Sequence, residues 1–181
     1  MSPELVKTLA LLVFAGLIIV AALKDLASFT IPNWISAALA ATFAPAALAA
    51  GIPIGAIGLS FALALGVLAL AAGLFALGWV GGGDAKLMTA ATLWLGHQGS
   101  SSVDPVRALV VNGLAPFALY TGLAGGALAL ALLGLRSDWL RPWTTAGPAW
   151  ARRLATPGEG TPYGVAIAVG ALAAFAAHPL A

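Results

Sequence analysis

The sequence predicts an all-α protein, a polytopic transmembrane helix bundle of about six spans with both termini outside the cytoplasm. The 181 residues are 61% hydrophobic and only 8% charged, and the mean hydropathy is +1.02, which is far more apolar than a soluble domain. The 22 glycines and 11 prolines suit membrane helices, where small residues let backbones approach closely. The composition therefore favours a helical bundle over a barrel.

Six apolar runs are the candidate spans, at residues 5–23, 34–50, 52–80, 85–97, 106–134 and 163–177. A spanning helix needs about 20 apolar residues, so the first, third and fifth runs are long enough and the fourth is short. The first run is long for the apolar core of a secretory signal and is followed at once by Lys24 and Asp25. We therefore expect a retained helix, within a single domain over residues 1–181.

The basic residues predict the orientation. With six spans, two basic residues, Lys7 and Arg107, fall on one side, and the other side receives Lys24, Lys86, Arg136, Arg141, Arg152 and Arg153. The richer side is expected to be cytoplasmic. The polar segment 135–162 then lies along the cytoplasmic face, where Trp139, Trp143 and Trp150 suit the interface.

Several classes of chemistry are disfavoured. The chain has no cysteine, so disulfides, thiol nucleophiles and cysteine-ligated zinc are excluded. Its two histidines, His97 and His178, are expected near the outer face, and no His-Glu-x-x-His motif occurs. The net charge of +2 comes without a basic patch. We expect no metal, no cofactor and no nucleic-acid partner.

Two aspartates stand out among the six acidic residues. Asp25 and Asp84 each adjoin an apolar run, and both are expected at the cytoplasmic ends of their helices. An acidic group costs about 2.5–3.5 kcal/mol at the centre of a membrane helix and less near the interface. Taken singly, Asp25 could be an ordinary interfacial residue. Asp84 follows three glycines and could simply cap the fourth helix.

Taken together, the two aspartates predict catalysis. Two carboxylates at one depth can share a proton and hold a water between them, as aspartic peptidase chemistry requires. Glycines 81–83 would give an extended substrate backbone close access to Asp84. Asp84 opens a helix, where backbone N–H groups favour an anion, whereas Asp25 follows the end of one. Our hypothesis is that Asp84 is mainly ionised and that Asp25 mainly carries the shared proton.

Three stretches resemble one known family, the type IV prepilin peptidases, which belong to the same broad class as archaeal preflagellin peptidases. They are DLASFTIPN at 25–33, GGGDAKLMTAATLWLG at 81–96 and TPYGVAIAVGAL at 161–172. The second contains the family's Gly-x-Gly-Asp signature. The third is similar to its Pro-Tyr-Gly entry into the last helix. The ordered set covers nearly the whole chain.

The resemblance implies catalytic roles for Asp25 and Asp84. It also implies an active-site loop that would help to bind substrate, comprising Gly81, Gly82, Gly83, Lys86, Pro32 and Asn33, although Lys24 and Lys86 also fit anchors at the headgroups. The expected reaction removes the leader of a prepilin just after a glycine, at the cytoplasmic face of the bacterial inner membrane. Only residues 24–33 separate the first two helices, so the chain resembles the short, peptidase-only form of tight-adherence (Flp) pilus systems, without methyltransferase activity.

One alternative belongs to a different class. In a non-enzymatic membrane subunit or a small ion- or proton-coupled transporter, the aspartates would bind cations or protons. Asn112 and Pro116, inside the fifth run, would then mark a polar pathway, although a packed kink is the simpler interpretation. Replacement of either aspartate by asparagine separates the two functions, because a catalytic pair should lose all processing.

Overall fold

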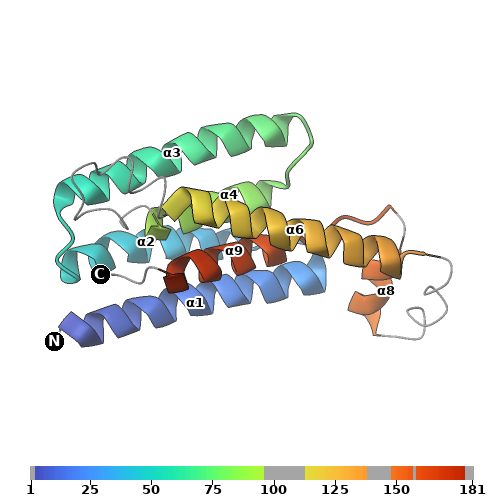
Figure 1. The fold of residues 1–181 in the computed structure, drawn as a ribbon, viewed down its shortest axis with the longest axis horizontal. Helices are drawn as coiled ribbons and strands as arrows, with labels where there is room; N and C mark the ends of the chain where they lie inside the picture. The colour runs from blue at the N-terminus through green and yellow to red at the C-terminus, as the bar shows by residue number, and fades with distance from the viewer. Residues whose placement is uncertain (1–2, 96–112, 138–147, 157, 178–181) are drawn as a thin grey trace.

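The computed structural model describes residues 3–95, 113–137, 148–156 and 158–177. Within these ranges every regular element is a helix (Figure 1). The helices are α1 Pro3–Ser28, α2 Asn33–Ala49, α3 Ile54–Ala76, α4 Gly82–Leu95, α6 Ala115–Leu135, α8 Ala149–Ala155 and α9 Tyr163–Ala177. The predicted all-α fold is therefore confirmed.

The chain is a helical membrane protein. Three stretches are long and apolar enough to cross a bilayer, namely Thr8–Ser28, Ile54–Ala76 and Ala115–Leu135, and Asn33–Ala49 and Tyr163–Ala176 are shorter apolar helices. Large apolar side chains cover the outer surface; Leu65 on α3 is 63% exposed and Leu130 on α6 is 72% exposed. Such a surface suits lipid and not water.

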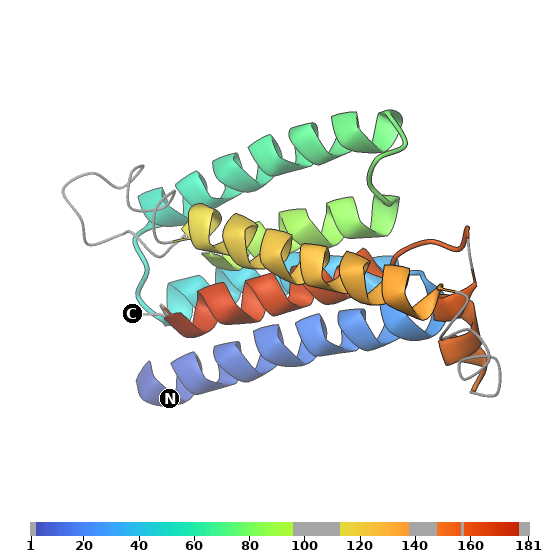
Figure 2. The ribbon, with the colours of Figure 1, turned by 45° about the vertical axis from the view of Figure 1, so that its right-hand side comes forward.

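The long helices run side by side and alternate in direction. The start of α1 and the end of α9 lie at one end of the bundle, and α8 lies at the opposite end (Figure 1). Helix α9 is central and packs on α6, α1 and α4, whereas α3 packs mainly on α4. Turning the bundle shows α3 and α6 on different sides of α4 (Figure 2). Helix α2 packs on both α1 and α4, so these contacts link the helices into one bundle.

An aromatic cluster is buried between these helices. Phe14 of α1 packs on Trp94 of α4 and on Phe175 of α9, with ring centroids 5.3 Å and 4.6 Å apart. The Trp94 indole N–H donates to the Leu39 carbonyl oxygen of α2 at 2.9 Å. A buried tryptophan is stable when its N–H finds an acceptor, so this cluster fixes four helices against one another.

The helix boundaries differ from the sequence-based ones in two places that concern the aspartates. The prediction that the first helix ends at Leu23 is wrong, because α1 continues to Ser28 and contains Asp25. The fourth helix begins at Gly82, so Asp84 is inside its first turn and does not cap it. By contrast, α2 begins at Asn33, directly after Pro32 and one residue before the predicted run.

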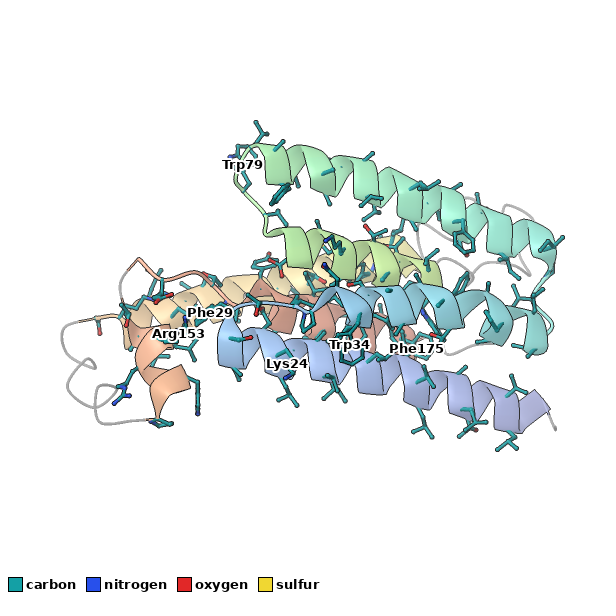
Figure 3. All side chains as sticks on the ribbon, turned by 180° about the vertical axis from the view of Figure 1, so that it is seen from behind. Lys24, Phe29, Trp34, Trp79, Arg153 and Phe175 are labelled. Carbon is teal, nitrogen blue, oxygen red and sulfur yellow. The ribbon has the colours of Figure 1, made fainter. Side chains whose placement is uncertain are left out.

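Some predictions fall on residues outside the described part of the chain. They concern the positions of His97, Arg107, Asn112, Trp139, Arg141, Trp143 and His178. In the segment that was expected to lie along the membrane, the described residues include the short helix α8. Its Trp150 is 47% exposed, and the Arg153 guanidinium lies over the Phe29 ring at 5.6 Å (Figure 3). This contact ties α8 to the end of α1.

Candidate active site

Asp25 is a buried acidic residue on α1, and its side chain is only 5% exposed. The Gly164 backbone N–H donates a hydrogen bond of 2.7 Å to Asp25 Oδ2. Gly164 belongs to the first turn of α9. A carboxylate of one helix is therefore held by the N-terminus of another, where backbone N–H groups have no partner within their own helix.

Only glycine fits at position 164. A Cβ on Gly164 would lie 2.8 Å from Asp25 Oδ2 and 2.7 Å from Ile31 Cδ1, closer than nonbonded carbon and oxygen atoms approach. The preceding Pro162 is fully buried. The start of α9 is thus fixed in place, and its Gly164 N–H is aimed at Asp25.

Asp84 occupies the first turn of α4. Its carboxylate folds back over Gly81, so that a Cβ there would lie 2.9 Å from Asp84 Oδ2, and it accepts a hydrogen bond from the Gly81 backbone. The Gly81 carbonyl oxygen accepts the first helical bond, from the Ala85 N–H at 3.0 Å. With aspartate in the third helical position, this is half of a capping box, because Gly81 has no side chain to bond the Asp84 N–H. A side chain at position 81 would have to displace the Asp84 carboxylate.

The two aspartates face one cavity of about 1370 Å³, which both side chains line. Ile31 lies between them: its Cβ is 3.2 Å from the position of a Cβ on Gly83, next to Asp84, and its other end meets Gly164, next to Asp25. Ile31 is therefore the spacer that sets how closely α4 and α9 approach at this site.

The residues of the expected active-site loop do not all reach the cavity. Its described lining includes the three glycines 81–83 and Asn33 but neither Pro32 nor Lys86. Lys86 is instead bound on the outer side, where its Nζ donates to Asn33 Oδ1 at 2.9 Å. This bond joins the first turn of α4 to that of α2. Pro32 precedes α2 in an extended conformation.

Sequence reasoning missed three residues near Asp25. Gly164 and Ile31 lie inside the stretches that carry the family resemblance, yet neither has a polar side chain that would suggest a role at the site. The third is Arg136, which the sequence analysis uses only to predict the orientation in the membrane. Its guanidinium binds three backbone carbonyls of the segment leading into α9, those of Leu154, Glu159 and Gly160, each at 3.0 Å.

The structure removes the basis for deciding which aspartate is ionised. That hypothesis rested on Asp84 alone being at a helix N-terminus. Asp84 does lie in the first turn of α4. Asp25, although it belongs to α1, accepts a hydrogen bond from the first turn of α9. Both carboxylates accept a backbone N–H donor, so the helix termini single out neither of them.

Among the described residues, no three His, Cys, Asp or Glu side chains come together as a candidate metal site. What the described residues do provide is a pair of carboxylates, each fixed by backbone donors, at the end of a cavity within a bundle of membrane helices. Such a pair is able to bind a water molecule and exchange protons with it. This arrangement defines the class as a helical membrane protein with an acidic site.

The family model described as the type IV leader peptidase family matches residues 12–130. The match covers more than half of the chain and includes both aspartates. The chain belongs to the type IV leader peptidase family, and its general activity is that of a prepilin-processing protease acting on pilin precursors. No curated protein and no solved structure matches the chain significantly.

Proposed function

We propose that this chain is an aspartic endopeptidase that removes the leader of Flp-like prepilins, with Asp25 and Asp84 as its catalytic pair. The observation that carries this proposal is that two carboxylates from different helices line one cavity. Each is fixed by backbone N–H groups and neighbouring glycines. Such preorganisation is what a general acid and a general base need.

The reaction needs one water molecule and one shared proton. The ionised carboxylate takes a proton from the water as its oxygen attacks the scissile carbonyl carbon, and the protonated carboxyl donates to the carbonyl oxygen. The tetrahedral intermediate then breaks its C–N bond, and the amine nitrogen takes up the proton that came from the water. One peptide bond and one water give a new carboxyl terminus and a new amino terminus, and the pair regains its single proton.

The glycines beside both carboxylates suit a peptide in extended conformation. Gly81, Gly82 and Gly83 line the cavity next to Asp84, and Gly164 adjoins Asp25. A helical substrate hides its carbonyls in its own hydrogen bonds, so the scissile residues must be unwound to be cut. Backbone that carries no side chains gives an unwound strand the room to approach.

The proposed location is the cytoplasmic face of the bacterial inner membrane, with the chain crossing the bilayer several times. The described basic residues at the aspartate end of the bundle support this orientation; they are Lys24, Lys86, Arg136, Arg152 and Arg153. Positive charge accumulates on the cytoplasmic side of membrane proteins. Helices α1 and α2 are joined by residues 29–32 alone, which supports a peptidase without methyltransferase activity.

The decisive experiment coexpresses the chain with an Flp-type prepilin and, separately, with a prepilin of the longer type IV class. Leader removal is followed by mass spectrometry of the pilin, which also reports N-methylation. We expect the wild-type chain to trim the Flp-type precursor without methylating it. Asp25→Asn and Asp84→Asn should each abolish trimming, whereas the control Glu159→Gln, a change at another acidic residue, should not.

Continued trimming by either asparagine variant would disprove the catalytic pair. It would then leave the aspartates with the ion- or proton-binding role of the transporter alternative. A methylated product would disprove the peptidase-only form. Preference for the longer class of precursor would disprove the Flp assignment and leave the catalytic pair intact.

A further inference from the structure

Asn33 is the first residue of α2, and its side chain does not cap that helix. The residue before the helix is Pro32, in an extended conformation, and no side chain forms a capping hydrogen bond there. Asparagine at the start of a helix is ordinarily used to accept a backbone N–H of the first turn. The Asn33 amide does not have this local role, so its contacts with other helices decide what it does.

Lys86 of α4 fixes which way round the Asn33 amide lies. The Lys86 Nζ donates a hydrogen bond of 2.9 Å to Asn33 Oδ1. An ammonium group has only donors, whereas a carboxamide has an acceptor oxygen and a donor nitrogen. Only the oxygen can face the lysine, because a reversed amide would bring two donors together. The Asn33 Nδ2 group therefore lies on the edge of the amide that faces away from Lys86.

This second edge of the amide faces the cavity of the two aspartates. Asn33 lines that cavity together with Asp25 and Asp84, whereas Lys86 does not line it. With Oδ1 bound to Lys86 on the outer side, Nδ2 is the group presented to the inside. None of the described residues accepts a hydrogen bond from Nδ2. The cavity thus contains, in addition to the carboxylates, an amide donor that has no protein acceptor in the described part of the chain.

Two hydroxyl groups that line the same cavity are directed elsewhere. The Thr30 Oγ1 is hydrogen-bonded to Ser28 Oγ at 2.9 Å, within the connection from α1 to α2. The Tyr163 hydroxyl points to α6, where a Cβ on Gly125 would lie 2.6 Å from it. Asn33 differs from both, since its donor group is not engaged by a neighbouring described residue.

Joining α2 to α4 is the simpler role for the bond between Lys86 and Asn33. Both residues are exposed, and a charged contact that water can replace contributes little to folding. The two helices are already joined in the interior, where the Trp94 indole N–H donates to the Leu39 carbonyl oxygen. By contrast, a positive charge on Oδ1 polarises the amide and makes Nδ2 a stronger donor. The bond is therefore better suited to orienting the amide than to holding the helices together.

We propose that Asn33 binds the substrate backbone: its Nδ2 donates a hydrogen bond to a peptide carbonyl oxygen of the unwound strand beside the scissile bond, and Lys86 is the positioning residue that orients it. This inference rests on the proposed function and adds to it a specific contact for the extended substrate. Unwinding leaves peptide carbonyls without their helical partners, and in apolar surroundings they need another donor. A neutral amide supplies one without consuming the single proton that the carboxylate pair shares.

Asn33→Asp distinguishes substrate binding from helix joining. The new carboxylate still accepts from Lys86, so the contact between α2 and α4 is kept, but the donor toward the cavity is replaced by an acceptor. We expect KM for an Flp-type prepilin to rise about tenfold, the value of one hydrogen bond, with a smaller change in kcat and an unchanged midpoint of thermal unfolding in detergent. Asn33→Leu, which has a similar size and no charge, should raise KM likewise.

Lys86 is tested by removing its donor and by keeping it. Lys86→Met leaves the Asn33 amide free to reverse, and we expect KM to rise about three- to tenfold, whereas Lys86→Arg keeps a charged donor and should restore most of the affinity. Lys24→Met is the matched control, because it removes an exposed lysine next to Asp25 in the chain that does not line the cavity. In the Asn33→Leu background, Lys86→Met should not raise KM further, since no amide is left to orient.

The possible failures of these tests are distinguishable. Cleavage by the wild type with the same KM for Asn33→Asp and Asn33→Leu would overturn the amide contact and leave the proposed peptidase intact. A lower unfolding midpoint of Asn33→Asp, in step with its lost activity, would also overturn it, because the effect would then be one of folding. Equal losses from Lys86→Met with and without the Asn33 amide would disprove the positioning role. No cleavage by the wild type would overturn both the proposed function and this inference.

Discussion

The Gly164 backbone N–H donates a hydrogen bond of 2.7 Å to Oδ2 of Asp25, although the two residues lie 139 positions apart in the chain. The bond joins the last turn of α1 to the first turn of α9. It holds the Asp25 carboxylate in one orientation, toward the cavity that Asp84 also lines. The geometry of the proposed catalytic pair therefore depends on a backbone group of a third helix.

A methyl group at position 164 should disrupt this geometry. Gly164→Ala would place its Cβ 2.8 Å from Asp25 Oδ2, so the carboxylate or α9 must move and the hydrogen bond is lost. A hydrogen bond to a charged group contributes about 1.5–3 kcal/mol, and we expect the rate of leader cleavage to fall roughly 10- to 100-fold. Gly126→Ala is the control, because a Cβ there meets nothing within 4 Å. Equal rates for the two variants would contradict the role assigned to Gly164.

Arg136 should act through the position of α9. Its guanidinium donates to three carbonyl oxygens of the segment before that helix, and lysine would keep the charge but lose the planar fork. We expect Arg136→Lys to lower kcat for leader cleavage roughly tenfold while KM changes little, since each hydrogen bond contributes about 0.5–1.5 kcal/mol. Arg152→Lys is the matched control. A rise in KM with unchanged kcat would instead indicate direct contact with the substrate.

The pH dependence should reflect one proton shared by two carboxyls. At low pH both Asp25 and Asp84 are protonated and no base is left to activate the water. At high pH both are ionised and no acid is left to protonate the scissile carbonyl. We expect the initial cleavage rate to follow a bell-shaped pH profile whose two limbs belong to the pair. A profile with only one limb would show that a single titrating group suffices.

The contact between α6 and α9 should be sensitive to any added side chain. A Cβ on Gly170 would lie 2.7 Å from the Thr121 backbone nitrogen and 2.9 Å from its Cα, so relief requires moving a whole helix. We expect Gly170→Ala to destabilise the folded protein by about 1–3 kcal/mol, measured as a lower midpoint of thermal unfolding in detergent. Gly126→Ala on the free side of α6 should leave the midpoint nearly unchanged. A stable Gly170→Ala variant would mean that the two helices pack less closely.

Much of the fold followed from hydropathy and helix signals. The last helix begins at Tyr163, as predicted, and α2 begins at Asn33, one residue before the predicted run, because Pro162 and Pro32 mark where each helix starts. The end of α1 was placed five residues too early because Lys24 and Asp25 resemble a polar boundary. Their charges do not break a helix, and the chain turns only at Phe29, whose φ of 52° is left-handed. Hydropathy reports where side chains prefer to be, and helix ends are decided by the backbone.

The site was predicted in part. Asp25 and Asp84 stood out because an acidic group next to a membrane span needs a reason, and the structure brings both to one cavity. The partner of Asp25 is not visible in the sequence, because it is the backbone N–H of Gly164 and no residue type indicates such a donor. Arg136 contributes only to the predicted orientation, since its three acceptors are backbone carbonyls from a distant segment. Backbone hydrogen bonds between remote segments become visible only once the helices are assembled.

The aromatic cluster has a mechanical consequence for the proposed catalytic pair. Asp25 belongs to α1 and Asp84 to α4, and the Phe14 and Trp94 rings hold these two helices together in the interior. The spacing of the two acids therefore depends on an apolar contact farther along the same helices. Loosening that contact would disable the chemistry without touching either aspartate.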